Sequence, residues 1–351
     1  MRIAQISTLA SPVCLGATHS IEQLVWLLTE ELIKLGHEVT LFAAEGSSTS
    51  GHLVATLPGP YAAPGSLGNW QTCEWVNLCQ AVEVSGEFDV LHSHGYLWGL
   101  PLEALTRTPI VHTLHVQPHD DEARLWSRVP GACVTAISAF QWSAYPELKP
   151  AAVIHHGIDP SQFEFEMHPQ DHVCYLGRFL PAKGAVEAIL TARKLGLRLV
   201  LAGPRSEFFS EQVEPLIDGQ LIKYIGPVDK ADRNRLLGGS RALLYTIREP
   251  EPFGLVQIES MMCGTPVAAI RIGAVPEIID EDVTGACADG IETFHEAIDR
   301  ALRLDRAGVR AQAVARFSAS RMARQYAELY QEIIERRKHI ASPQHSTKRS
   351  P

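Results

Sequence analysis

The sequence lacks the signals that would place it in a membrane or outside the cell. No run approaches the roughly 18 apolar residues that a membrane-spanning helix needs. Only Arg2 precedes the short apolar run at residues 3–6, which is typical of a first strand rather than of a secretory signal. The seven cysteines are scattered without a CxxC pair, so we expect reduced thiols. These absences predict a cytoplasmic protein without a transmembrane segment.

Positive charge is scarce in the first part of the chain. Residues 1–150 contain 6 Lys and Arg against 14 Asp and Glu, which is a balance of −8 in a chain whose net charge is −9. An acidic half of this kind argues against nucleic acid and against a polybasic membrane surface as partners. The sequences GxGxxG, GxxxxGK[ST] and GxSxG are also absent, so the dinucleotide, P-loop and esterase hypotheses have no support.

What the chain does have is a regular alternation of strand-like and helical segments. In the clearest helix, residues 21–35, apolar positions recur close to a 3.6-residue period and Gly36 ends the pattern. Alternation predicts parallel strands, because a parallel return needs a crossover. We expect strands at residues 2–6, 38–43, 89–92, 110–114, 133–137, 152–155, 173–177, 198–202, 221–225, 242–245 and 266–270.

The length of 351 residues and a restart of the pattern after the polar stretch 159–171 predict two domains. We expect an α/β protein of two Rossmann-like domains, residues 1–158 and 159–319, that face each other across a cleft at the carboxyl edges of their strands. A final helix should cover residues 320–338. The polar tail, residues 339–351, should be disordered.

The most informative segment is EPEPFGLVQIESMMCGTPV at residues 249–267, in which Glu251 and Glu259 stand eight residues apart. A helix that begins near Gly254 would turn free backbone N–H groups toward a diphosphate or sugar hydroxyls. One carboxylate could then meet a sugar while the other reaches a ribose diol, since carboxylates accept paired hydrogen bonds. A solvated surface acid is the ordinary alternative for a single Glu, but the shaped turn at 252–254 argues against it.

A second segment, LGRFLPAKG at residues 176–184, places two cations in a short loop between a strand and a helix. Arg178 and Lys183 at the carboxyl end of a strand could clamp a diphosphate and stabilise negative charge on a leaving group. Two solvated loop cations are the alternative.

These segments resemble glycosyltransferase family 4, the "glycosyl transferases group 1" type, whose members have the two-domain GT-B fold. The resemblance extends over about residues 1–335 and is most specific in the second domain. The motifs that carry it are LGRF at 176–179, KG at 183–184, HHGIDP at 155–160, EPFGLVQIES at 251–260, GTPV at 264–267, GHEVTLFA at 36–43, DVLHSHG at 89–95 and GPVDKADRNRLLGGSRALLY at 226–245.

The resemblance implies a donor site in the second domain. Glu251 matches the glutamate at the donor sugar, and Glu259 matches the glutamate that binds the ribose. Arg178 and Lys183 match the pair that binds the pyrophosphate. Val228 is similar to the residue whose backbone meets the base.

Further matches concern backbone contacts and the first domain. Phe253, Gly254 and Leu255 match residues whose backbone contacts the sugar and phosphate. His115, in VHTLH, matches a histidine near the donor sugar and the acceptor. In the GT-B fold the last helix crosses back to the first domain, which suits the helix at 320–338.

One departure from the family lies before Glu22. Members commonly have a Gly-Gly pair three and two residues before the matching glutamate, where this chain has His19 and Ser20. The nearest glycine is Gly16, and we expect Gly16 and Ser20 to contact the donor. Because glycines let the backbone approach the phosphates, the change puts that contact in question. A smaller departure is Asp282, where a turn glycine is usual.

The resemblance implies a retaining transfer from a nucleoside diphosphate sugar, UDP- or GDP-linked, that needs neither metal nor cofactor. No second carboxylate is placed as a nucleophile, which favours front-face attack over double displacement. The acceptor, a small molecule, lipid or glycan, should be chosen by the loops at 45–75 and 94–130, whose acidity disfavours a strongly anionic acceptor. Two alternatives stay open: a GT-B epimerase or phosphorylase, and a weak or silent nucleotide-sugar-binding protein.

Weaker signals have ordinary explanations beside functional ones. His92, His94, His112 and His115 alternate along two expected strands, where a metal site, structural hydrogen bonds and substrate contacts are all open. The DxD pattern at 280–282 precedes a Thr-Gly turn, which indicates a solvated turn. Partly buried packing is the simplest expectation for three tryptophans that could also stack a ligand, namely Trp70, Trp75 and Trp98.

Overall fold

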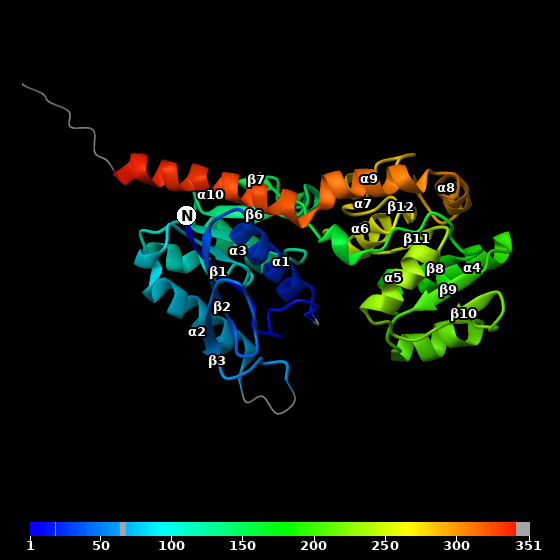
Figure 1. Cartoon of the computed structure of the whole chain (residues 1–351), viewed down its shortest axis with the longest axis horizontal. Coiled ribbons are helices and arrows are strands. Elements are labelled where there is room, and N and C mark those ends of the chain that lie inside the picture. Colours follow the sequence, from blue (N-terminus) through cyan, green and yellow to red (C-terminus); the bar gives the residue numbers. More distant parts are fainter. Residues whose placement is uncertain (18, 64–67, 342–351) are drawn as a thin grey trace, which may run out of the picture. The chain divides into compact units, whose positions relative to one another are not determined.

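The computed structural model describes residues 1–17, 19–63 and 68–341, and the chain divides into two compact units (Figure 1). Unit 1 contains Met1–Ala136, Tyr145–Ile154 and Met322–Pro351, and unit 2 contains Ile137–Ala144 and His155–Arg321. The expected boundary after residue 158 therefore lies four residues too late. The segment Ile137–Ala144, which we expected in the first domain, belongs to unit 2.

Unit 1 is built on a parallel sheet in the strand order β3-β2-β1-β4-β5-β6-β7. This is the order of a doubly wound Rossmann sheet with one further strand. Its strands are β1 (Arg2–Ile6), β2 (Glu38–Ala44), β3 (His52–Leu57), β4 (Val90–Ser93), β5 (Ile110–Thr113), β6 (Cys133–Ala136) and β7 (Ala152–Val153). Its helices are α1 (Ser20–Lys34), α2 (Trp70–Glu83), α3 (Asp120–Ser127) and most of α10 (Ala319–Ala341).

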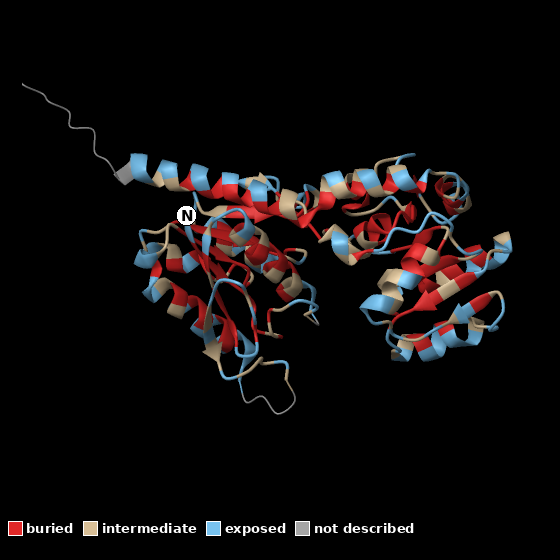
Figure 2. Cartoon of the chain, in the orientation of Figure 1, coloured by how far each residue is buried: buried red, intermediate tan, exposed pale blue. Residues whose placement is uncertain are grey.

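The final helix, α10, begins in unit 2 and packs on the core of unit 1. Its buried residues Met322, Tyr326 and Tyr330 lie in one apolar cluster with Ile3 of β1 and Val90 of β4. Figure 2 shows the alternation of buried and exposed residues along α10 that this one-sided packing requires. Residues 339–341, which we assigned to a disordered tail, are helical, and residues 342–351 lie outside the described residues.

Unit 2 contains a second parallel sheet in the order β10-β9-β8-β11-β12-β13. Its strands are β8 (Val173–Leu176), β9 (Leu199–Ala202), β10 (Ile222–Tyr224), β11 (Leu243–Tyr245), β12 (Val267–Ile270) and β13 (Gly285–Ala288). Its α-helices are α4 (Ala185–Leu195), α5 (Lys230–Gly239), α6 (Leu255–Met262), α7 (Val275–Ile278), α8 (Phe294–Ala301) and α9 (Arg306–Phe317). The prediction of two Rossmann-like α/β domains is confirmed.

Both sheets reverse their strand order at one place, and that place is where open α/β sheets bind ligands. In unit 1 the reversal lies between β1 and β4, and in unit 2 it lies between β8 and β11. The loops that follow β8 and β11 contain Arg178, Lys183 and Glu251. The sheet of unit 2 thus brings together predicted site residues that are about 70 positions apart in the sequence.

No helix within residues 1–17, 19–63 and 68–341 combines the length and apolar character that crossing a bilayer requires. All seven cysteines are free thiols.

Candidate active site

Five predicted site residues line one pocket at the strand-order reversal of unit 2. The pocket has a volume of about 180 Å³, and its walls come from β8, β11, the loops that follow them and the start of α6. The predicted residues that line it are Arg178, Lys183, Glu251, Gly254 and Leu255. The structure therefore gathers the two cations, one carboxylate and a helix N-terminus that were selected from separate motifs.

Glu251 is held by two polar side chains. Lys183 Nζ forms an ion pair with Glu251 Oε1, and the Tyr245 hydroxyl donates to Glu251 Oε2 at 2.7 Å. Burial, together with the neighbouring Glu251 charge, raises the pKa of Tyr245 well above its usual range, so the hydroxyl remains a donor. Tyr245 was missed from sequence, although a hydroxyl at the carboxyl end of a buried strand was a usable signal.

The backbone around Glu251 is also held by the neighbouring residues Gly273 and Ala274. The Glu251 carbonyl accepts from the Ala274 amide at 3.0 Å. Gly273 packs so closely that a Cβ there would lie 2.6 Å from the Glu251 nitrogen, and its φ is +63°. Only glycine fits this approach, and the loop that presents Glu251 is rigid as a result.

Gly254 begins helix α6 at the floor of the pocket. Its φ of +92° is left-handed, and a Cβ would lie 2.5 Å from the Tyr245 hydroxyl and 2.5 Å from Gln257 Nε2. No side chain caps this helix end, and the first N–H groups of a helix have no partner within it. With Leu255 and Val256 also in the pocket wall, α6 presents its positive end to whatever binds there.

Arg178 and Lys183 lie on a loop that is locked to the end of β11. The Gly184 carbonyl accepts from Thr246 Oγ1 at 2.7 Å, and a Cβ on Gly184 would overlap the Thr246 carbonyl. The Arg178 side chain is exposed, and the described part of the chain offers it no ion-pair partner. Arg178 therefore contributes an exposed cation to the wall of the pocket.

Glu259, Val228 and Phe253 do not line this pocket. Glu259 forms an ion pair with Arg233 at 2.8 Å, and burial raises the pKa of Glu259 against the opposing effect of Arg233. Val228 lines a separate pocket of about 340 Å³ beside β9 and β10. The Phe253 ring is buried, 4.8 Å from the His156 ring in an edge-on contact, so only its backbone can serve a ligand.

Glu277 of α7 forms hydrogen bonds with two segments that lie where the chain passes between the units. Its carboxylate accepts from the Ala139 and Phe140 amides, both at 2.7 Å, and from His155 Nε2 at 3.3 Å. Burial would raise the pKa of Glu277, but the bonds from His155, Ala139 and Phe140 outweigh it and lower the pKa. This is why Ile137–Ala144 belongs to unit 2.

In unit 1 the predicted residues lie at the carboxyl edge of the sheet. His115 follows β5, and burial lowers the pKa of His115 to about 4, so its ring is neutral. Gly16 and Ser20 are exposed on either side of position 18, which lies outside the described residues. The loop between β1 and α1 is anchored by buried Glu22, which accepts from the amides of Ala10 at 3.1 Å and Ser11 at 3.2 Å.

The four alternating histidines form hydrogen bonds with side chains around them. His112 Nε2 lies 3.1 Å from Glu103 Oε1, and His94 Nδ1 lies 2.9 Å from His115 Nε2. His92 bonds to side chains on both of its ring nitrogens. Of the three open hypotheses, the geometry favours structural hydrogen bonding for His92 and His112.

Other weak signals also have structural roles. In the DxD pattern, Glu281 and Asp282 both bind Arg300, at 2.5 and 2.7 Å, and Asp282 occupies a left-handed turn with φ of +61°. Trp70 packs on Trp98 with ring centroids 5.1 Å apart and is 38% exposed. The tryptophan cluster is thus partly buried at the surface of unit 1.

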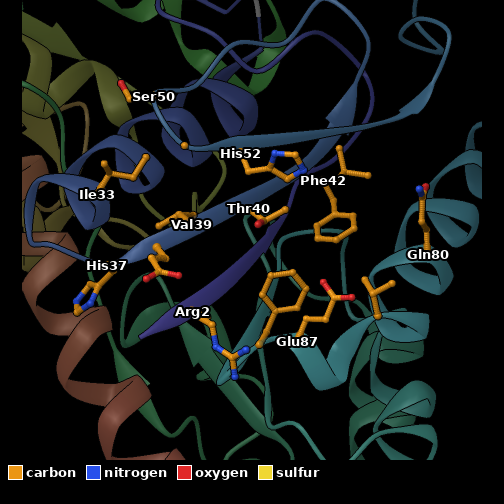
Figure 3. Close-up of a pocket in the computed structure, with 15 residues that line it drawn as sticks. Arg2, Ile33, His37, Val39, Thr40, Phe42, Ser50, His52, Gln80 and Glu87 are labelled. Atoms are coloured by element: carbon orange, nitrogen blue, oxygen red, sulfur yellow. The ribbon is translucent and has the colours of Figure 1, made fainter.

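A larger pocket of about 710 Å³ lies elsewhere on unit 1 (Figure 3). Arg2, Thr40, Phe42, His52 and Glu87 point into it from β1, β2, β3 and the segment before β4. It contains none of the predicted site residues and includes the amino ends of β1 and β2, whereas parallel sheets bind ligands at the carboxyl ends. We therefore place the active site at the smaller pocket of unit 2.

Two Rossmann-like sheets, with cations and a helix N-terminus at the order reversal of the second, are typical of proteins that bind a nucleotide or a phosphate. Known families agree: the model described as Glycosyl transferases group 1 matches residues 161–316, and the model described as Glycosyltransferase Family 4 matches residues 21–162. The chain belongs to the GT-B glycosyltransferases of the family 4 type.

Individual proteins with similar sequence or structure agree with this assignment. The D-inositol 3-phosphate glycosyltransferase of Mycolicibacterium smegmatis is 26% identical over 367 residues, covering 85% of this chain and 84% of its own. The crystal structure of AviGT4, a glycosyltransferase of avilamycin A biosynthesis, superposes with a TM-score of 0.74 at 24% identity, covering 95% and 98% of the two chains. Anabaena HepE in complex with UDP-glucose gives a TM-score of 0.66 at 19% identity, covering 95% and 100%.

Proposed function

We propose that this glycosyltransferase moves a sugar from a nucleoside diphosphate sugar to a hydroxyl acceptor, with retention of configuration and without a metal ion. The observation that carries the proposal is the pocket of unit 2, where Arg178, Lys183, Glu251 and the start of α6 meet. Cations and a helix N-terminus suit a diphosphate, and a carboxylate suits sugar hydroxyls. HepE, which has a similar fold, was crystallised with UDP-glucose, which agrees with these contacts.

The Lys183–Glu251 ion pair prepares both residues for the donor. When a diphosphate enters, Lys183 can exchange the carboxylate for phosphate oxygens, which leaves Glu251 to accept hydrogen bonds from the sugar. Tyr245 continues to orient Glu251 during this exchange, because its hydroxyl bonds to the other carboxylate oxygen. Arg178 at the pocket mouth adds a second positive charge to the leaving group.

Front-face transfer is the mechanism that these groups support. Of the residues that line the described pocket, Glu251 is the only acid, and its ion pair makes it a poor nucleophile. In our scheme the bond from the anomeric carbon to the diphosphate oxygen breaks and the diphosphate keeps the electron pair. The acceptor oxygen bonds to the same face of that carbon, and its proton passes to the departing phosphate oxygen. Cationic side chains take the charge-stabilising role that a metal has in other transferases.

For the donor base we favour UDP, because HepE was crystallised with UDP-glucose, and GDP is the second choice. For the acceptor we propose an uncharged hydroxyl compound. Residues 35–106 contain no Lys and no Arg, so much of unit 1 offers no cation to an acceptor phosphate. This would separate the chain from its relatives that act on D-inositol 3-phosphate. We further propose that the enzyme works in the cytoplasm, where its free thiols would stay reduced.

The competing hypothesis is a silent nucleotide-sugar-binding protein, which His19 and Ser20 motivate. Both side chains are exposed at the start of α1, where Ser20 is the first helical residue and His19 makes no capping bond to the helix. They are therefore positioned to contact a ligand by side-chain hydrogen bonds where the family uses glycine backbone.

The deciding experiment measures thermal stabilisation by UDP, GDP, ADP and TDP sugars with and without EDTA, followed by release of the nucleotide in the presence of pooled hydroxyl acceptors. We expect one nucleotide class to bind and turn over unchanged in EDTA, with the product anomer the same as the donor anomer. Binding without any release of nucleotide would favour the silent protein. An inverted product would refute front-face transfer.

A further inference from the structure

A continuous row of hydrogen-bonded side chains runs through unit 1 below the carboxyl edge of its sheet. It begins at His115, whose Nε2 lies 2.9 Å from His94 Nδ1, and His94 Nε2 lies 2.8 Å from Gln5 Oε1. Gln5 Nε2 donates to the Tyr330 hydroxyl at 3.2 Å, and that hydroxyl lies 2.6 Å from His92 Nδ1. Apart from His115, each of these side chains is at most 2% exposed.

The far end of the row is a group that can only accept. His92 Nε2 lies 2.7 Å from Thr113 Oγ1, which lies 2.6 Å from Thr135 Oγ1, and Thr135 donates to the backbone carbonyl of His112 at 3.4 Å. A carbonyl has no proton to give, so Thr135 must spend its single proton there. Thr135 therefore accepts from Thr113, and Thr113 accepts from His92 Nε2.

The direction of every other bond follows from this end. Burial lowers the pKa of His92 well below its usual range, so His92 is neutral and carries its one proton on Nε2. Its Nδ1 must then accept from the Tyr330 hydroxyl, and that hydroxyl accepts from the amide of Gln5. The same assignment turns Gln5 Oε1 toward His94, where it can only accept.

His94 donates to Gln5 from Nε2. Its ring is 2% exposed, and burial disfavours a second proton that would charge it, so the lone pair lies on Nδ1. His115, neutral through its lowered pKa, must donate from Nε2 to that lone pair. We propose that Gln5 is a positioning residue that fixes the proton of His115 on Nε2, acting through His94, and that Tyr330 of α10 holds the Gln5 amide in the required orientation.

The consequence for chemistry is that His115 presents Nδ1 as an acceptor and not as a donor. Rotation of the Gln5 amide by half a turn would reverse the protons of both histidines and make Nδ1 a donor. Nδ1 is buried in the ligand-free structure, so a local movement must uncover it before it can receive a hydrogen bond from a sugar or acceptor hydroxyl, which a phosphate oxygen could not provide. This last step rests on the proposed role of His115 in transfer, whereas the position of its proton does not.

The elements that meet in the row are far apart in sequence. Gln5 belongs to β1 and His94 directly follows β4, whereas Tyr330 lies on α10, 325 residues after Gln5. The last helix therefore contributes a hydroxyl to the hydrogen bonds beneath the predicted site as well as apolar area to the core.

The test is long-range proton–nitrogen correlation NMR of histidine-labelled, ligand-free protein at neutral pH, with signals assigned by single histidine substitutions. We expect Nε2–H tautomers for His94 and His115 in the wild type. In Tyr330→Phe, the amide of Gln5 loses its acceptor, and both histidines should show mixed tautomers. The control is Tyr326→Phe on the same helix, which removes a hydroxyl 3.1 Å from Thr113 and leaves Gln5 untouched.

Nδ1–H tautomers in the wild type, or unchanged tautomers in folded Tyr330→Phe, would overturn the proposal. Gln5→Leu is a second variant whose histidine tautomers are measured in the same way. Melting curves show whether each variant is folded. Turnover, measured separately, should fall roughly fivefold in Tyr330→Phe, the worth of one ordinary hydrogen bond. Mixed tautomers with unchanged turnover would uphold the positioning role of Gln5 and refute only the role of His115 in transfer.

Discussion

Gly254→Ala tests whether the left-handed residue at the start of α6 builds the active site. The added Cβ would lie 2.5 Å from the Tyr245 hydroxyl, whereas ordinary contacts begin near 3.4 Å, so the hydroxyl must move by almost 1 Å. Tyr245 is 6% exposed and has little room, and its 2.7 Å bond to Glu251 would be lost. We expect left-handed strain of about 1–2 kcal/mol and a broken charge-assisted bond of about 1.5–3 kcal/mol.

Gly196→Ala is the matched control. Gly196 has a similar φ of +67° at the end of α4, but a Cβ there would meet nothing within 4 Å. Both variants should therefore lose similar stability from backbone strain. Calorimetric titration with the nucleotide sugar should show at least roughly tenfold weaker binding for Gly254→Ala only, which corresponds to 1.4 kcal/mol. Equal donor affinity in the two variants would refute the reasoning.

Three further predictions concern single side chains. Burial raises the pKa of Glu74 to about 7 from its ordinary 4.5, so the protonated carboxyl gives its full stabilisation below pH 4.5 and this is lost as pH rises through 7. The unfolding free energy of the wild type should fall by about 3 kcal/mol over this range. Chemical denaturation of Glu74→Gln should show a flatter dependence of stability on pH. Lys183→Met should weaken diphosphate binding in titrations, whereas Lys194→Met, in the last turn of α4, should not. Because the pKa of Glu277 is lowered, its stabilisation is present above pH 4.5 and is lost as pH falls through the lowered pKa. Glu277→Gln should therefore lower the melting temperature more at pH 7 than at pH 3, and an equal loss at both would contradict the stabilising role of these bonds.

The sequence predicted the central strands of both sheets but missed one edge strand in each, β3 and β13. β3, at the edge of its sheet, is half exposed and has no continuous apolar run, so no strand was expected there. β13 reads GACA, which is too rich in small residues to indicate a strand. Phe209–Val213 forms a π-helix, and a short turn with Pro215, which cannot continue a helix, follows it.

In the candidate active site, residues in local motifs were predicted, whereas contacts that depend on how distant segments pack were not. Arg178, Lys183 and Glu251 each sit in a recognisable motif, and the resemblance to the family implied that they share one donor site. Tyr245 ends one of the quoted motifs, but nothing in that motif singled it out as a site residue. The bond between Gln5 and Tyr330 depends on where the last helix packs, which no local pattern specifies.

The measurement that tests the central claim most directly is calorimetric titration of wild type, Glu251→Gln and Glu249→Gln with the stabilising nucleotide sugar and with its free nucleoside diphosphate. Glu249 is an exposed acid two residues from Glu251 and lines no part of the pocket, so it controls for the loss of charge. We predict that Glu251→Gln binds the nucleotide sugar at least roughly tenfold more weakly, while Glu249→Gln binds it like the wild type. Unchanged binding of the nucleotide sugar by Glu251→Gln would contradict the assignment of this pocket as the donor site.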